Sequence, residues 1–282
     1  MKKKSIVKSL NIAFDESNLV NYKDIKDKIE PFDLIACRGG DILSDFIEIL
    51  ESKQVGMGKF THVGMIVNSD ILPKCKVEKH DFYLEENKLY ILESTFSYTI
   101  DGIIDNIPDV STNKGKFGVQ LRDFEALIPH YIMNDKTKVA WCKLKNNPYS
   151  KTENDTKESL IERRMLLQSI FVPFFNDYHD RLYEIDALGL FGAMFPSLRL
   201  LRDNRDKIYK KLYKKLNRYH ITENKGPGGW QFCSELVANV YLLIGILDKN
   251  VNPKNVLPID FFGYDEDNIQ ALVESPIFIR DW

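Results

Sequence analysis

The sequence has no long apolar run, few cysteines and almost no net charge, and each of these absences excludes a class of protein. No window reaches the roughly 18 continuous apolar residues of a membrane-spanning helix. The four cysteines are widely scattered and include no C-x-x-C pair, which argues against a disulfide framework or a zinc knuckle. The formal net charge of −2 argues against a protein dedicated to nucleic acid, so we expect no specific nucleic-acid partner.

The rest of the composition is that of a folded domain in a reducing compartment. Hydrophobic residues make up 44% of the 282 residues, enough to fill a substantial core. Scattered cysteines favour a reducing interior. The N-terminal sequence is basic, but it has no apolar stretch of signal-peptide length and no small-residue cleavage site. We therefore expect a soluble, cytoplasmic protein in which residues 1–282 form a single domain.

Hydrophobic periodicity predicts a mixture of strands and helices. Strands are expected in residues 62–67, 88–95, 138–145 and 276–280, with a strand and a turn in 31–40 and a short strand followed by a helical turn in 116–128. Helices are expected after Asp41, after Cys233 and through much of 160–220. The stretch 146–159 is polar, and no strand is evident between it and the glycine-rich segment near 226. Residues 146–225 are therefore predicted to be a helical insertion or subdomain within an α+β fold.

The predicted insertion ends in a basic amphipathic segment, residues 198–220. Nine Lys or Arg residues lie between Arg199 and Arg218, against two Asp. An apolar stripe runs along one side of it. It is interpreted either as a helix packed on the domain with a solvated basic face, or as a peripheral contact with an anionic membrane. The apolar segment 187–201 before it fits both interpretations.

The stretch "GPGGWQFCSELVANVY" places Cys233 where a glycine-rich loop turns into a helix. Free amide N–H groups and the helix dipole favour an anion at such a position, so they lower the pKa of a thiol and activate it. The same amides are able to stabilise an oxyanion. A small cysteine packed at a helix start is the alternative. Position alone does not separate a nucleophile from a packing residue.

A nucleophilic thiol needs a base, and a base needs a group that orients it. His62 stands at the entrance to an apolar strand after a glycine-bearing loop, whereas the other four histidines lie in polar or mixed stretches and are predicted to be surface residues. Glu93 continues the inward apolar side of its strand, where an unpaired charge is costly. If the two strands are neighbours, Glu93 reaches His62. Both residues also have structural interpretations, as a strand-edge histidine and a solvated strand-end glutamate.

Three stretches resemble the circularly permuted papain-like enzymes of the NlpC superfamily, in particular the YiiX/YaeF-like permuted amidase family. They are "FDLIACRGG…LSDFIEIL", "KFTHVGMIV" and "FCSELV". The histidine precedes the cysteine, the reverse of ordinary papain-like enzymes. The resemblance covers residues 28–145 and 225–280. Two departures are Phe32, in a position that the family usually gives to glycine before Asp33, and Thr61 where serine is usual.

The resemblance implies a small antiparallel barrel-like sheet with the cysteine helix packed on it. It implies attack on a carbonyl by the Cys233 thiolate, with His62 as base and then acid and Glu93 as the orienting group. An acyl-enzyme would follow, released by water or by another nucleophile, on a peptide amide or a lipid acyl substrate. No metal or organic cofactor is required. Tyr183, in "RLYEI", is a further candidate for substrate binding.

The leading hypothesis from the sequence is therefore a cysteine hydrolase (amidase or peptidase) or acyltransferase. A non-catalytic lipid- or membrane-binding module that keeps the same fold is the alternative, motivated by residues 187–220. A zinc hydrolase with His and Cys ligands is a third hypothesis, disfavoured because no pair of ligands has metal-site spacing.

Overall fold

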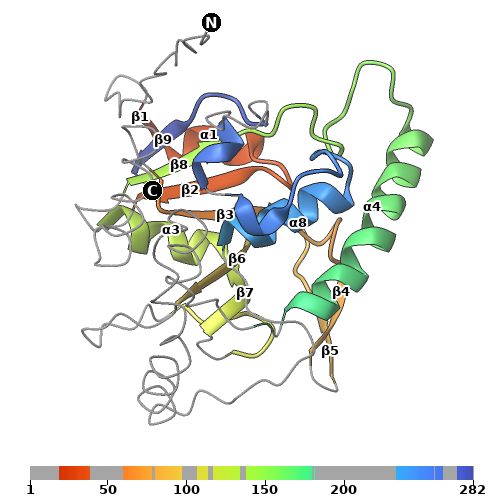
Figure 1. Ribbon diagram of the computed structural model, residues 1–282, viewed down its shortest axis with the longest axis horizontal. Coiled ribbons are helices and arrows are strands. Elements are labelled where there is room, and N and C mark those ends of the chain that lie inside the picture. Colours follow the sequence, from red (N-terminus) through yellow and green to blue (C-terminus); the bar gives the residue numbers. More distant parts are fainter. Residues whose placement is uncertain are drawn as a thin grey trace, which may run out of the picture.

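The computed structural model has a mixed α+β fold, as predicted from the sequence (Figure 1). The residues that it describes are 19–38, 60–77, 80–96, 107–113, 117–133, 138–179, 181, 233–256, 258–262 and 272–281. All structural statements below concern these residues. Tyr183, the basic segment 198–220 and the helix predicted after Asp41 lie outside them.

Seven strands form one sheet in the order β1-β9-β8-β2-β3-β6-β7. Every pairing in it is antiparallel except that of β1 with β9. The strands are β1 Leu19–Asn21, β2 Leu34–Arg38, β3 His62–Val67, β6 Tyr90–Phe96, β7 Phe117–Asp123, β8 Lys138–Cys142 and β9 Ile277–Asp281. A separate hairpin pairs β4 Lys74–Val77 with β5 His80–Tyr83, and the sequence analysis did not predict it.

The barrel-like closure expected from the sequence is not seen among the described strands, which form an open sheet. The edge strands β1 and β7 pair with β9 and β6 and not with each other. The physical reason is that helices cover both faces. A sheet buried on both faces is a middle layer between two cores, so it does not have to curl round a core of its own.

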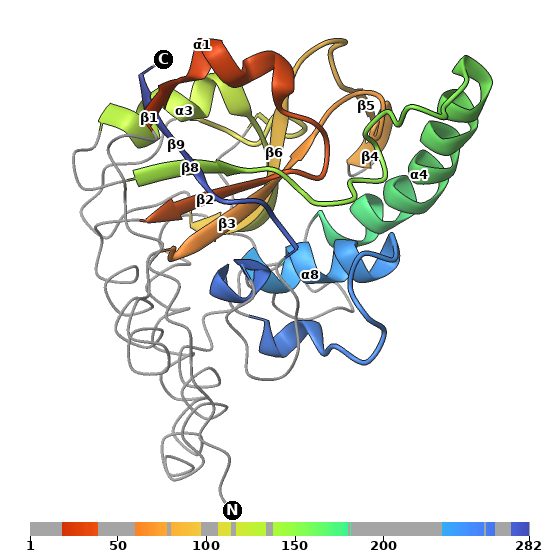
Figure 2. The same ribbon diagram turned by 90° about the horizontal axis from the view of Figure 1, so that it is seen from above.

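Four α-helices are described: α1 Tyr22–Ile25, α3 Phe124–Met133, α4 Lys157–Tyr178 and α8 Cys233–Leu243. Short 3-10 turns, η2 Lys26–Lys28, η5 Pro253–Asn255 and η6 Pro258–Phe262, complete the described elements. Figure 2 shows α1 and α3 on one side of the sheet and α8 on the other. Among the described residues, none of the helices is both long enough and apolar enough to cross a membrane.

Each face of the sheet has its own hydrophobic core. Under α8 and α4 the core takes Leu34, Met65 and Leu92 from the strands. Under α1 and α3 it takes their immediate neighbours in the sequence, Ile35, Ile66 and Ile91. Successive side chains of a strand point to opposite faces of the sheet, so the residues of each strand alternate between the two cores.

Helix α4 lies within residues 146–225, the segment predicted to be a helical insertion. It begins after Thr156, whose side chain accepts a hydrogen bond from the Ser159 backbone N–H at 3.1 Å, a helix N-cap. Its buried face includes Phe171 and Phe175, which join the core beneath α8. This part of the insertion therefore packs into the main core.

Candidate active site

The structure brings together the three residues expected to form a catalytic site. Cys233 is the first residue of α8, and His62 is the first residue of β3. Glu93 lies in β6, which pairs directly with β3. By the alternation of the strands, His62 and Glu93 lie on the face that carries Ile66 and Ile91. Helix α8 packs against β3 and β6 from the other face, and its first residue meets His62 at the end of the sheet.

The Cys233 thiol is buried and hydrogen-bonded to the His62 imidazole. Burial by itself raises the pKa of this thiol. The hydrogen bond and charge of His62, together with the backbone N–H groups of Val63 and Ser234, outweigh burial and hold the pKa of Cys233 below its ordinary value. The Ser234 amide is one of the free N–H groups of the first turn of α8. The arrangement therefore favours a thiolate.

The His62 imidazole is clamped between the thiol and a carboxylate. Its Nε2 lies 2.6 Å from Glu93 Oε2, which leaves Nδ1 as the ring nitrogen to exchange a proton with the sulfur. Burial lowers the pKa of His62, but the hydrogen bonds and negative charges of Cys233 and Glu93 outweigh burial and raise this pKa to about 10. The geometry therefore stabilises an imidazolium beside a thiolate.

Glu93 is fully buried and forms an ion pair with Arg122 of β7, which is also buried. Arg122 Nε donates to Glu93 Oε1 at 2.6 Å. The Tyr131 hydroxyl of α3 accepts from the Arg122 guanidinium at 3.1 Å and lies 3.4 Å from Glu93 Oε2. Burial raises the pKa of Glu93, but Arg122 and then His62 outweigh it and lower this pKa to about 2. Glu93 is thus an ionised, oriented carboxylate and not a solvated strand end.

Gly64 provides the room in which Glu93 approaches His62. A Cβ atom added at Gly64 would lie 2.5 Å from Ile91 Cδ1 and 3.2 Å from Glu93 Cβ. The first contact would force the Ile91 side chain to shift, and the second is tighter than most contacts that a Cβ atom makes. The absence of a side chain at Gly64 therefore leaves room for β6 to bring Glu93 close to β3.

No family model and no curated protein matches this sequence.

Sequence reasoning missed Arg122 and Tyr131. The available signal was a basic residue on an inward position of the strand "FGVQLRD", matching the acidic residue on an inward position of "YILEST". Two buried charges of opposite sign on neighbouring strands are expected to pair. The neighbourhood of β6 and β7 had not been predicted, so this signal was not used.

The prediction that His179 is a surface residue is wrong. His179 is buried, and its Nε2 lies 3.1 Å from Asp109 Oδ2 and 2.8 Å from Ser111 Oγ. Asp109 also accepts the Leu121 backbone N–H at 2.9 Å. This cluster ties the end of α4 to β7. His130 is exposed, as predicted. The side chain of His80 and all of His220 lie outside the part of the protein that the structure describes.

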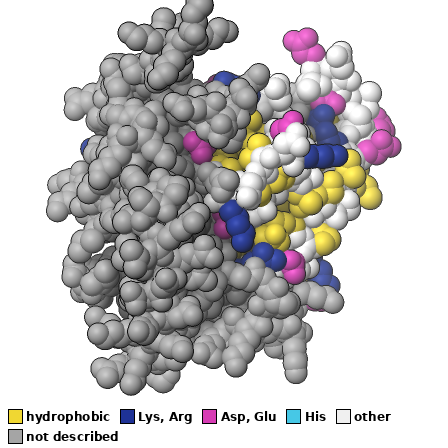
Figure 3. Space-filling view, in the orientation of Figure 1, with side chains coloured by type: hydrophobic (Ala, Val, Ile, Leu, Met, Phe, Trp, Pro, Cys, Tyr) yellow, Lys and Arg dark blue, Asp and Glu magenta, His cyan; other side chains and the backbone are white. Residues whose placement is uncertain are grey.

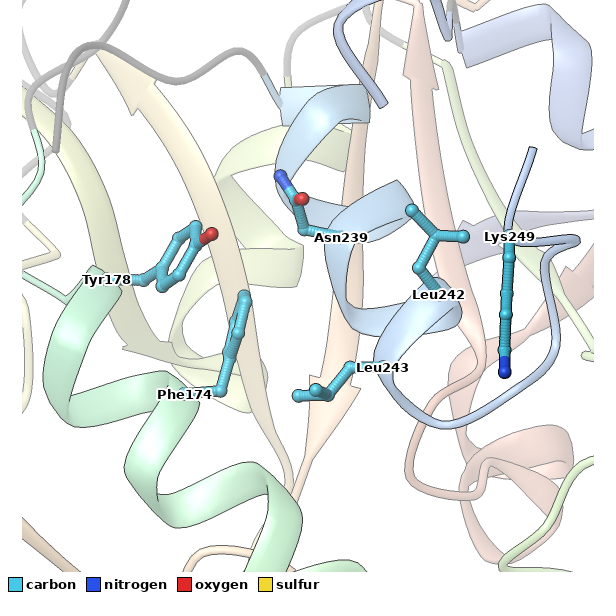
Figure 4. A pocket seen from close by; sticks show the side chains of 6 residues that line it. All are labelled: Phe174, Tyr178, Asn239, Leu242, Leu243 and Lys249. Carbon is cyan, nitrogen blue, oxygen red and sulfur yellow. The ribbon is translucent and has the colours of Figure 1, made fainter. Parts of the chain in front are cut away.

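An open groove of about 320 Å³ lies between α4 and α8 (Figure 4). Its lining residues are Phe174, Tyr178, Asn239, Leu242, Leu243 and Lys249. Asn239 and Leu243 are six and ten positions after Cys233 on α8, on the outer side of a helix whose other side packs on the sheet. The groove is therefore separate from the thiol.

Exposed apolar side chains gather on the same side of the molecule (Figure 3). The exposed large apolar residues of α4 and α8 are Ile161, Met165, Leu166 and Leu243. Within the part of the chain that the structure describes, no three His, Cys, Asp or Glu side chains are placed to hold a metal ion.

Replacing Gly64 by alanine tests whether the close approach of β3 and β6 shapes the site. We expect Gly64→Ala to lower the free energy of unfolding by about 1–3 kcal/mol through overpacking and to slow alkylation of Cys233. The control is Gly245→Ala, at φ +78° with no atom within 4 Å of the added Cβ. It should cost about 1–2 kcal/mol in backbone strain and leave the alkylation rate unchanged. Equal alkylation rates in both variants would contradict the role assigned to Gly64.

The thiolate–imidazolium pair predicts an unusual pH profile for Cys233. In the native protein, alkylation of Cys233 by iodoacetamide is followed by mass spectrometry. Its rate should reach half the maximum at a pH well below the ordinary thiol pKa of about 8.5. His62→Ala should move this midpoint upward, because burial then dominates the thiol. Cys142 is an internal control: burial raises its pKa far above the ordinary range, so it should stay unreactive in both proteins. A midpoint that does not depend on His62 would contradict the pair.

Proposed function

We propose that the protein is a cysteine-dependent acyl hydrolase or acyltransferase with Cys233 as nucleophile. One observation carries the proposal: a buried thiol at a helix start interacts with an imidazole whose Nε2 lies 2.6 Å from an ionised carboxylate. Nucleophile, base and orienting group thus stand in the order that covalent acyl transfer needs.

The chemistry follows from this geometry. His62 Nδ1 takes the thiol proton, and the thiolate attacks the substrate carbonyl carbon. The tetrahedral oxyanion is stabilised by backbone N–H groups at the start of α8. Its collapse breaks the bond to the amine or alcohol, which leaves with the proton from His62. Water, or another nucleophile, then gives its proton to His62 and attacks the thioester, releasing the acyl product and restoring the thiol.

The substrate class that we propose, a peptide amide or a lipid acyl linkage, rests on the resemblance to permuted papain-like enzymes. Several features of the structure support a permuted papain-like fold. The cysteine begins a helix packed on an antiparallel sheet that carries the histidine earlier in the chain. Phe32, in the position that the family usually gives to glycine, has a φ of +71°, a conformation that favours glycine. Asp33 is buried after it and accepts hydrogen bonds from Trp141 and Leu144.

An activated ester tests the proposal without knowledge of the natural substrate. Incubation with p-nitrophenyl acetate should acetylate the protein at Cys233, seen by intact-mass and peptide mass spectrometry, with release of p-nitrophenolate. Cys233→Ala should lose the adduct and at least about 100-fold of the release rate, since nucleophilic catalysis is removed. Cys75→Ala, which removes a buried thiol elsewhere, should retain both. Equal release by Cys233→Ala and the native protein would contradict the proposal.

A lipid- or membrane-binding module is the second candidate, and the exposed apolar side chains of α4 favour it. Ile161, Met165 and Leu166 are each at least half exposed, in the first half of α4. Single exposed apolar residues are ordinary, but several on one helix mark a contact surface. An unreactive Cys233 in a chain that binds anionic vesicles would favour this candidate. Both functions together would suit an enzyme that acts on lipids.

A further inference from the structure

The Glu93 carboxylate lies between two cationic side chains, one from each neighbouring strand. β6 pairs with β3 on one side and β7 on the other. His62 Nε2 contacts Oε2 at 2.6 Å, while Arg122 Nε donates to Oε1 at 2.6 Å. Each oxygen therefore has its own partner. Because the guanidinium fork is planar and rigid, it fixes the plane of the carboxylate, and with it the direction in which the second oxygen faces the imidazole.

The pair is closed off from water. Arg122 is 1% exposed and Glu93 is 0% exposed. The Tyr131 hydroxyl bridges the two side chains from α3, at 3.1 Å from the guanidinium and 3.4 Å from the carboxylate. Charges interact strongly in such a low-dielectric environment, so a single uncompensated charge would shift every ionisable group nearby.

The four charged groups of the ionised site sum to zero. The Cys233 thiolate and the Glu93 carboxylate each carry −1, and the His62 imidazolium and the Arg122 guanidinium each carry +1. Among the described residues, the Cys37 thiol from β2, directly opposite His62, and the Tyr131 hydroxyl also face these groups. Burial raises the pKa of Cys37 well above its ordinary value, so this thiol stays neutral. Without Arg122 the buried group would carry a net charge of −1.

We propose that Arg122 is the positioning residue of this site: it turns one oxygen of Glu93 to His62, and its charge balances Glu93 so that the thiolate and imidazolium form within a neutral group of four. This role rests on the proposed function of Cys233 and His62. Arg122 acts through Glu93, with which it forms a buried ion pair.

The pH midpoint of Cys233 alkylation by iodoacetamide tests the role, because a merely structural arginine would not move it. Removing a positive charge raises the pKa of every neighbouring group. Arg122→Gln should therefore raise the midpoint by about one pH unit. Arg122→Lys keeps the charge but loses the fork, and it should restore most of the shift. Circular dichroism and thermal unfolding verify that each variant is folded.

A double variant separates charge balance from packing. Glu93→Gln combined with Arg122→Gln keeps the net charge at zero, so its midpoint should move back from that of Arg122→Gln toward the native value. Removing both members of a buried ion pair also leaves no unpaired charge, so the double variant should fold. If Arg122→Gln does not fold, the double variant is compared with Glu93→Gln. The Arg122 charge is then the only difference between them, and identical midpoints would overturn the proposal.

The outcomes also distinguish this inference from the function on which it rests. A native midpoint well below pH 8.5 that is unchanged in folded Arg122→Gln overturns the role of Arg122 and leaves Cys233 as the nucleophile. A native midpoint at the ordinary thiol value overturns both. A depressed native midpoint that rises in Arg122→Gln and recovers in Arg122→Lys supports both.

Discussion

The site depends on one buried carboxylate, that of Glu93. It has no access to water, so its charge persists only because Arg122 and His62 each satisfy one of its oxygens. Removing one partner of a buried ion pair typically costs about 3–5 kcal/mol, because the remaining charge is stranded. This penalty holds β3, β6 and β7 in register around the site. The negative charge of Glu93 also favours the protonated imidazole of His62, which in turn favours the thiolate of Cys233.

The fold delivers these groups from different layers to one point. Strand alternation places His62, Glu93 and Arg122 on the α3 side, while α8 supplies the sulfur from the opposite side at the end of β3. Gly64 permits the close approach of β6, and two backbone N–H groups meet the sulfur. The open sheet suffices for this, since only one helix start and three adjacent strands take part.

Local patterns in the sequence predicted much of the fold and part of the site. The strand His62–Val67 and the helix beginning at Cys233 have clear apolar periodicity and were predicted within a few residues. The inward position of Glu93 followed from alternation. Arg122, Tyr131 and the burial of His179 were not predicted, because each depends on which elements become neighbours. The hairpin β4–β5 was missed because its short strands are charged, and the open sheet because closure depends on distant pairings.

In this site the His62 imidazolium is stabilised by two anions, the Cys233 thiolate and the Glu93 carboxylate. The most direct test is a ¹⁵N NMR titration of the His62 ring in the native protein and in Cys233→Ala. The native ring should stay protonated through neutral pH and lose its proton only toward pH 10. In Cys233→Ala the loss should occur at distinctly lower pH, because one of the two anions is gone. A native His62 ring that is neutral at pH 7, or one that titrates identically in both proteins, would contradict the account.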